Sequence, residues 1–461
     1  MAAGCTSSTM STATQQSVSG GPVFVVGTDA PAAVASIVGV PIQIETIELT
    51  NTSTSTTSNN LLVNATTVDF ARYNGLQGLV DMNDVQPGTY TGVTITLGTA
   101  SINYLSPGTP PTISTETATL SSPSVSMMLP NPLTVSQKGG VPVGLRIDLD
   151  LGQSIVTSGG VPTGTINPTF DVSTVARTDT GGHIDEFVGA VTTPPSSATA
   201  TSFVITGPHG EAFTINISNS TEWDGGATET QLLNDGTKAV VAVAGQFDPA
   251  DQTLDADEIA ILTDTNFYAR GLVTYVSPST GAANAMQFYV RAVLPSDLAA
   301  VPLGGLANVT ITGNENYGIY WMHNAFTNIL FNDAALTPGQ EIAVGGADPT
   351  GAAGSSFDVK RIHLHNWGYV GTVAAGSENA GQGFFKMNVT GFAGQVIPSP
   401  ILVYLGSGCD FRYGFGAFND VTDNTQIRVV GILLKLNGQD VLVARHIDGN
   451  NHTDMTATAW Q

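Results

Sequence analysis

A pair of histidines could support metal chemistry in this chain. His363 and His365 alternate with Ile362 and Leu364, so both imidazoles would lie on one face of a strand. That spacing can bind a transition metal when a third ligand comes from elsewhere. Neither an H-E-x-x-H nor a C-x-x-C motif lies nearby to supply that ligand. A polar outer strand face is the simpler interpretation, and we predict neither a metal site nor a cofactor.

Two aspartates and a cysteine are further candidates for chemistry. Asp148 and Asp150 share a strand face and could bind Ca²⁺ with help from loops, although a solvated face is the simpler explanation. Cys409 could be a nucleophile, but a lone cysteine is more often a small buried apolar residue. No G-x-S-x-G elbow is present, and no local motif favours the paired carboxylates of a glycosidase. We therefore expect a protein that is not an enzyme, and a hydrolase is the least favoured alternative.

Aromatic residues mixed with Asn and Glu form the best candidate for a binding site. Exposed rings of this kind can stack on sugars while polar neighbours bind the hydroxyl groups, and small OB-type barrels bind oligosaccharides through loops and a strand face. The alternative is that the rings fill the ends of barrels, where burial stabilises by roughly 1.5–3 kcal/mol each. The residues predicted to bind a ligand are Tyr317, Tyr320, Trp321, Trp367 and Tyr369.

These residues lie within a pattern that occurs three times. Each copy opens with a G-x-V sequence at Gly189, Gly271 or Gly371 and closes with an alternating strand, at 254–261, 357–364 or 441–447. Three further β-type segments recur in the same order between them. Five short strands with period-two alternation predict a small Greek-key barrel like the OB fold, in which strand glycines allow a bulge or sharp bend. A plain antiparallel meander is the alternative.

The region before the repeats also has a β-type pattern. Alternating segments follow one another at short, regular spacing between Pro-rich and Gly-rich breaks, which predicts a β-sandwich. We therefore predict an all-β protein, with an N-terminal sandwich followed by three tandem five-stranded OB-like barrels. The predicted units are a tether at 1–20, the sandwich at 21–180, barrels at 181–264, 265–365 and 366–450, and a tail at 451–461.

Ordered motifs in the two regions resemble two bacterial families of domains of unknown function. The N-terminal region is similar to family 4382, which is found on bacterial and archaeal lipoproteins, through T-D-A-P at 28–31, P-G-T-Y-T at 87–91 and R-I-D-L-D-L at 146–151. The repeats resemble family 5666, often found in tandem on exported proteins, through the G-x-V opening, the V-x-V-x-G strand and D-A-D-E-I at 255–259. That family has no established catalytic residues, so the resemblance implies no chemistry.

The charge of the chain excludes several classes of partner. The net charge is −23, so nucleic acid is not an expected partner, because its binding needs Lys and Arg to neutralise phosphates. An anionic membrane surface would be repelled for the same reason. Ca²⁺ or a cationic partner would fit this charge, but the solubility of an exported protein explains it more simply.

The first residues suggest a lipid anchor. The sequence A-A-G-C at 2–5 resembles the end of a bacterial lipoprotein signal, in which the cysteine is lipidated, so Cys5 is the predicted lipidation site. The Ser/Thr-rich stretch at 6–20 would then be a flexible tether. A disordered terminus with an incidental cysteine is the alternative.

Together these features predict a non-catalytic, exported lipoprotein of the cell envelope, most consistent with the outer membrane. We expect a binding or adhesion protein whose partner is an extracellular glycan or another envelope protein. A structural spacer or a self-assembling surface component is the alternative function.

Overall fold

The computed structural model describes most of the chain. The described residues are 21–30, 34–51, 53–137, 143–176, 183–207, 212–224, 227–248, 253–265, 267–294, 298–320, 331–346, 349–391, 393–436 and 438–449. The predicted tether, the predicted tail, Cys5 and Trp321 lie outside these residues. Within the described part of the chain, no helix is long and apolar enough to cross a membrane.

Two β-sheets packed face to face form the N-terminal unit, which we call the sandwich. One sheet has the order β14 (Phe170–Ala176), β11 (Val143–Asp150), β1 (Gly21–Ala30) and β6 (Gly78–Val85). The other is built on β10 (Ser124–Val135), β7 (Gly88–Ser106), β3 (Pro41–Asn51) and β4 (Thr56–Thr57), with β2 (Ile37–Gly39), β5 (Thr66–Asp69) and β8 (Thr112–Thr117) added at its sides. A small third sheet contains β12 (Ile155–Ser158), β13 (Val161–Ile166) and β9 (Thr119–Leu120). The short helices are η1 (Phe70–Tyr73) and α1 (Leu151–Ser154).

Three smaller β units follow the sandwich. The first unit contains β15 (His183–Thr193), β16 (Ser202–Thr206), β17 (Ala212–Asn216), β18 (Glu222–Trp223), α2 (Glu229–Asp235), η4 (Gly236–Lys238), β19 (Val240–Asp248) and β20 (Thr253–Thr263). The second contains β21 (Phe267–Ser277), β22 (Ala285–Leu294), β23 (Leu306–Thr310), β24 (Asn316–Ile319), η5 (Asp333–Ala335), β25 (Glu341–Gly346), β26 (Ser356–Asp358) and β27 (Arg361–His365). The third contains β28 (Trp367–Val373), β29 (Phe384–Val389), β30 (Ile401–Arg412), η6 (Phe418–Asp420), β31 (Gln426–Leu436) and β32 (Gln439–Asp448).

The all-β prediction is confirmed, but the three predicted barrels are confirmed only in part. Among the described residues, the third unit alone forms a closed barrel, in the order β28-β29-β30-β32-β31. In the second unit the closing segment is split into β26, which pairs with β23, and β27, which pairs with β25, so the sheet stays open. In the first unit β17 contacts β20 over a short parallel stretch, and β18 extends the sheet from β20.

The repeated glycines lie where neighbouring strands come unusually close. A Cβ atom at Gly271 would overlap the carbonyl oxygen of Tyr289, and one at Gly431 would overlap the carbonyl oxygen of Val443. Both glycines also lie at shifts in strand register, as expected for bulges that bend a strongly curved sheet.

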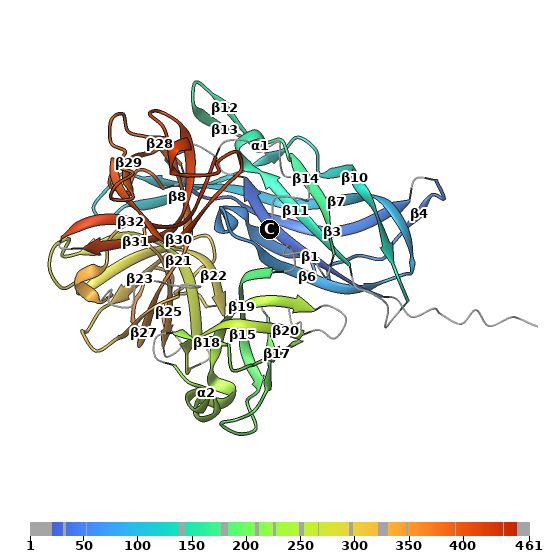
Figure 1. Cartoon of the computed structure of the whole chain (residues 1–461), viewed down its shortest axis with the longest axis horizontal. Coiled ribbons are helices and arrows are strands. Elements are labelled where there is room, and N and C mark those ends of the chain that lie inside the picture. The colour runs from blue at the N-terminus through green and yellow to red at the C-terminus, as the bar shows by residue number, and fades with distance from the viewer. Residues whose placement is uncertain are drawn as a thin grey trace, which may run out of the picture.

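The four units pack around a common centre instead of forming a string (Figure 1). Strand β1 shows how this works, because alternate side chains serve two different cores. Val23 and Val25 face the interior of the sandwich, whereas Phe24 and Val26 join the core of the first unit. The ring of Phe24 packs edge-to-face on Phe247 of the first unit, with 5.4 Å between ring centroids.

The barrel of the third unit also contributes side chains to more than one core. Ile432 and Leu434 of β31, with Val443 of β32, pack into the core of the second unit. On the opposite side, Trp367 and Tyr369 belong to the same apolar cluster as the interior of the sandwich. The units therefore share their cores, because both faces of several strands are covered.

A buried cluster of charged side chains lies at this common centre. Glu341 accepts hydrogen bonds from Arg270 Nε at 3.0 Å and from Arg291 Nη1 at 2.8 Å, and all three side chains are almost fully buried. Arg270 also pairs with Glu186 of the first unit. Burial lowers the pKa of Arg270 to about 10, so its guanidinium remains charged at neutral pH.

Arg291 connects this cluster to the other two units. Its Nη2 donates to the carbonyl oxygen of Val38 in the sandwich at 3.0 Å, and its guanidinium lies 4.4 Å from the ring centroid of Trp367 in the third unit. The indole of Trp367 in turn donates to the carbonyl oxygen of Ala71 at 3.0 Å. One arginine of the second unit therefore contacts both the sandwich and the third unit.

Replacing Glu341 should destabilise the whole assembly. We expect Glu341→Gln to lower the free energy of unfolding by about 3–5 kcal/mol, because it leaves two buried guanidinium groups without their shared counter-ion. Urea denaturation followed by circular dichroism measures this change. The exposed Glu45 provides a matched control, and Glu45→Gln should have almost no effect. Equal stability of the two variants would contradict the role of the cluster.

Candidate functional site

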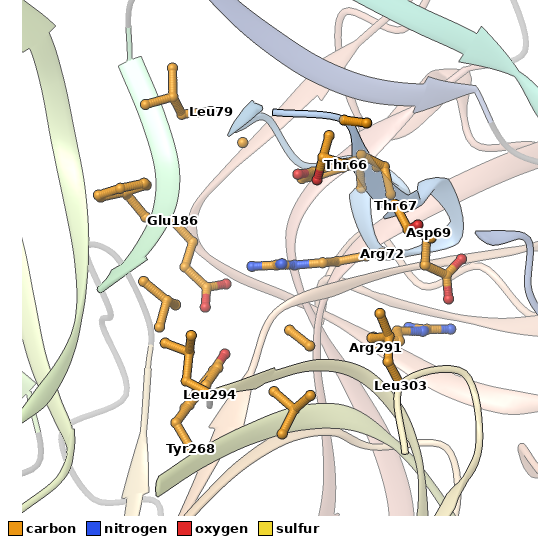
Figure 2. Close-up of a pocket in the computed structure, with 18 residues that line it drawn as sticks. Thr66, Thr67, Asp69, Arg72, Leu79, Glu186, Tyr268, Arg291, Leu294 and Leu303 are labelled. Carbon is orange, nitrogen blue, oxygen red and sulfur yellow. The ribbon is translucent and has the colours of Figure 1, made fainter. Parts of the chain in front are cut away.

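A cavity of about 280 Å³ lies where the sandwich, the first unit and the second unit meet (Figure 2). We call it the central cavity. Its polar lining includes Arg72 from the sandwich, Glu186 from the first unit and Tyr268 from the second. Its apolar lining includes Leu79 and Leu294. Leu303, Ala65 and Thr67 are exposed lining residues, so the cavity reaches the surface beside them.

The turn after β5 places Arg72 in this cavity. Asp69 is the N-cap of η1, and its Oδ1 accepts hydrogen bonds from the backbone N–H groups of Val40 at 2.8 Å and Ala71 at 3.2 Å. The guanidinium of Arg72 lies 5.7 Å from the ring centroid of Tyr73. Among the described residues, Arg72 makes no hydrogen bond or ion pair. The cavity therefore contains a cation without a counter-ion in contact.

The polar groups around this cation have unused hydrogen-bonding capacity. Glu186 Oε2 pairs with Arg270, but its other oxygen, Oε1, is buried and accepts no hydrogen bond from the described residues. Within the same part of the chain, the hydroxyl of Tyr268, a residue 1% exposed, also has no hydrogen-bond partner. Burial raises the pKa of this hydroxyl above its usual range, so it remains a donor. Figure 2 shows Arg72 and Tyr268 both pointing toward the carboxylate of Glu186.

Asp69 and Arg291 also line the cavity, but they serve the structure around it. Asp69 Oδ2 accepts from the hydroxyl of Tyr289 at 3.2 Å, and that hydroxyl accepts from Asn103 at 2.7 Å. In Figure 2 the carboxylate of Asp69 and the guanidinium of Arg291 lie together, away from Glu186. Burial raises the pKa of Asp69, while the charge of Arg291 and three hydrogen bonds oppose that rise.

The polar groups of the central cavity are suited to holding a ligand by hydrogen bonds and ion pairs. A guanidinium, a tyrosine hydroxyl and the Oε1 atom of Glu186 can hold a ligand with both an anionic group and a hydrogen-bond donor. The apolar walls can bury the remainder of such a molecule.

The predicted ligand-binding aromatics lie elsewhere, and most of them are buried. Trp367 is fully buried, and the hydroxyl of Tyr369 donates to the carbonyl oxygen of Gly339 at 3.0 Å. Tyr320 is 4% exposed and donates to the carbonyl oxygen of Asp185 at 3.2 Å. These three rings are buried, which agrees with the alternative that such rings fill the interior, and their role in ligand binding stays a prediction. Tyr317 is half-buried.

The other candidates for chemistry are also inside the protein. His363 and His365 are buried, not on a polar outer face, and burial lowers the pKa of His363 to about 3 and that of His365 well below its usual range. Asp148 is 3% exposed instead of solvated, and burial raises its pKa to about 6. Asp150 accepts from the backbone N–H of Gln153 at 2.8 Å as the N-cap of α1. Burial raises the pKa of the half-buried Cys409 to about 12, which disfavours the reactive thiolate.

The central cavity was not predicted because its polar residues come from three separate units. One signal was nevertheless present in the sequence. Lys and Arg number 14 in 461 residues, yet Arg270 stands between Ala269 and Gly271 in a strongly apolar strand. An arginine in such a strand must be paired in the interior, which points to a buried polar site.

Comparison with known families matches the N-terminal part of the chain. Residues 21–168 match the family described as Domain of unknown function (DUF4382), which confirms the resemblance of the sandwich to that family. This match covers most of the sandwich, including the segment that carries Arg72. A search of curated proteins gave no match for the chain.

The buried hydroxyl of Tyr268 should lower the stability of the ligand-free protein. We expect Tyr268→Phe to raise the free energy of unfolding by about 1–3 kcal/mol, because it removes a buried hydroxyl that has no partner among the described residues. Tyr289→Phe is the matched control and should destabilise, since that hydroxyl both donates and accepts. Urea denaturation of the ligand-free protein distinguishes the two cases. A loss of stability in Tyr268→Phe would show that its hydroxyl already has a structural role.

Proposed function

We propose that this protein is a non-catalytic binding protein that holds a small carboxylate-bearing molecule in the central cavity. The observation that carries the proposal is the guanidinium of Arg72, which has no ion pair among the described residues and points into a cavity. A half-buried cation of this kind is stabilised when an anion binds beside it.

The surrounding groups restrict the chemistry of the ligand. A carboxylate on the ligand would accept hydrogen bonds from Arg72 and from the hydroxyl of Tyr268. An ammonium or hydroxyl group on the same molecule would donate to Glu186 Oε1. An apolar body would pack against Leu79 and Leu294. A small amino acid with an aliphatic side chain has all three features.

The cellular setting of this proposal follows from the sequence. The A-A-G-C motif with Cys5, the acidic composition and the family match of the sandwich support an exported lipoprotein of the cell envelope. The three following units share one order of strand pairing, which supports the view that they are variants of a single OB-like module and members of family 5666. A structural spacer made of independently folded domains is less well supported, because the units share their cores.

A matched pair of ligands tests the proposal. In a panel of small carboxylates, L-leucine should raise the melting temperature more than 4-methylpentanoate, which has the same carboxylate and carbon skeleton but lacks the ammonium group. A ligand at one hundred times its Kd stabilises by about 2.7 kcal/mol, so differential scanning fluorimetry resolves the effect.

Variants link that stabilisation to the cavity. Arg72→Met should abolish the shift, whereas Arg412→Met, which alters an arginine paired with Asp410 outside the cavity, should preserve it. A shift that survives in Arg72→Met, or no shift with any carboxylate of the panel, would rule out this site.

A further inference from the structure

A second cavity, also of about 280 Å³, lies between the first and second units. We call it the polar cavity, because nearly all of its lining is polar. Asp224 and Gln231 line it from the first unit, and Asn316, Arg361 and His363 line it from the second. None of these residues lines the central cavity, so the two sites are independent.

The lining is held by regular structure on both sides. Strands β24 and β27 pair in parallel, with Asn316 opposite Arg361 and Gly318 opposite His363. The imidazole of His363 lies against Gly318, where any Cβ atom would come within 2.8 Å of the ring. Across the cavity, Thr228 caps α2 by accepting from the backbone N–H of Gln231 at 3.1 Å. The polar groups therefore occupy defined positions before any ligand arrives.

The polar cavity contains groups of both charges and a neutral ring. Arg361 donates to the carbonyl oxygen of Ile261 at 3.2 Å, and Asp224 provides a carboxylate. His363 is 6% exposed, and its Nδ1 is buried without a hydrogen-bond partner in the part of the chain that the structure describes. Burial, together with the charges of His365 and Arg361, lowers the pKa of His363 to about 3, so the ring is neutral at physiological pH.

This lining selects for ligands that can replace water. A polar cavity several times larger than the roughly 30 Å³ occupied by one water is hydrated. A ligand group gains affinity there only when it reproduces the hydrogen bonds of the water it displaces. Hydroxyl groups do so, because each both donates and accepts, whereas an apolar ligand cannot reproduce the hydrogen bonds of the displaced water.

We propose that the polar cavity binds a neutral, hydroxyl-rich ligand of the size of a pyranose sugar. The carboxylate of Asp224 accepts from hydroxyl groups, Arg361 donates to them, and the amides of Gln231 and Asn316 do both. His363 Nδ1 takes the remaining hydrogen bond. Tyr317 also lines this cavity, so one of the aromatic residues predicted from the sequence lies at the site.

The test uses methyl glycosides and the full chain. Methyl β-D-glucopyranoside, methyl β-D-galactopyranoside and methyl α-D-mannopyranoside serve as probes in isothermal titration calorimetry, and at least one should bind. Asn316→Ala and His363→Phe should each weaken binding of that glycoside at least tenfold. The exposed Asn314 lies two residues from Asn316 but does not line the cavity, so Asn314→Ala should bind as the wild type does.

Several outcomes would overturn this inference. Absence of binding by all three glycosides would mean that the polar cavity holds only water, and unchanged affinity in Asn316→Ala would place any binding elsewhere. Asn316 is exposed, so this variant remains informative if His363→Phe does not fold. Arg72→Met should keep glycoside binding intact, which separates this site from the one proposed in the central cavity.

Discussion

The arrangement of the whole molecule depends on two buried arginines that share one glutamate. Arg270 and Arg291 both donate to Glu341, and their guanidinium groups also contact the first unit, the sandwich and the ring of Trp367 in the third unit. Charges in a protein interior are tolerated only when they are paired and hydrogen-bonded. Separating any one unit would therefore expose or unpair part of this cluster, so the four units are held as one body.

Much of the fold was predictable because β-structure leaves a local signal. Alternating apolar residues marked the strands, and the G-x-V and V-x-V-x-G patterns marked the curved, bulged strands of the three repeats. The shared cores were not predicted, although β1 carried a clue in its continuous run Val-Phe-Val-Val at 23–26. Such a run indicates a strand covered on both faces. The sequence does not reveal which distant segment packs on the second face of β1, which here is the segment that contains Phe247.

The sites were less predictable, for two physical reasons. The side chains of Arg72, Glu186 and Tyr268 meet only after three units dock, so no spacing along the chain indicates them. Trp367 and Tyr369 suggested a surface site because amphipathic rings occur both at binding surfaces and in cores. Their polar atoms instead find backbone carbonyl oxygens inside the protein, at Ala71 and Gly339. A ring with its polar atom satisfied internally can be fully buried.

Both proposed sites lie between units, so a ligand in either cavity would contact more than one unit. This arrangement requires that the units keep fixed positions relative to one another. Differential scanning calorimetry of the intact chain tests it most directly. We predict a single unfolding transition whose calorimetric and van't Hoff enthalpies agree. Separate transitions for the sandwich and the smaller units would contradict the claim, because they would show that the units unfold independently.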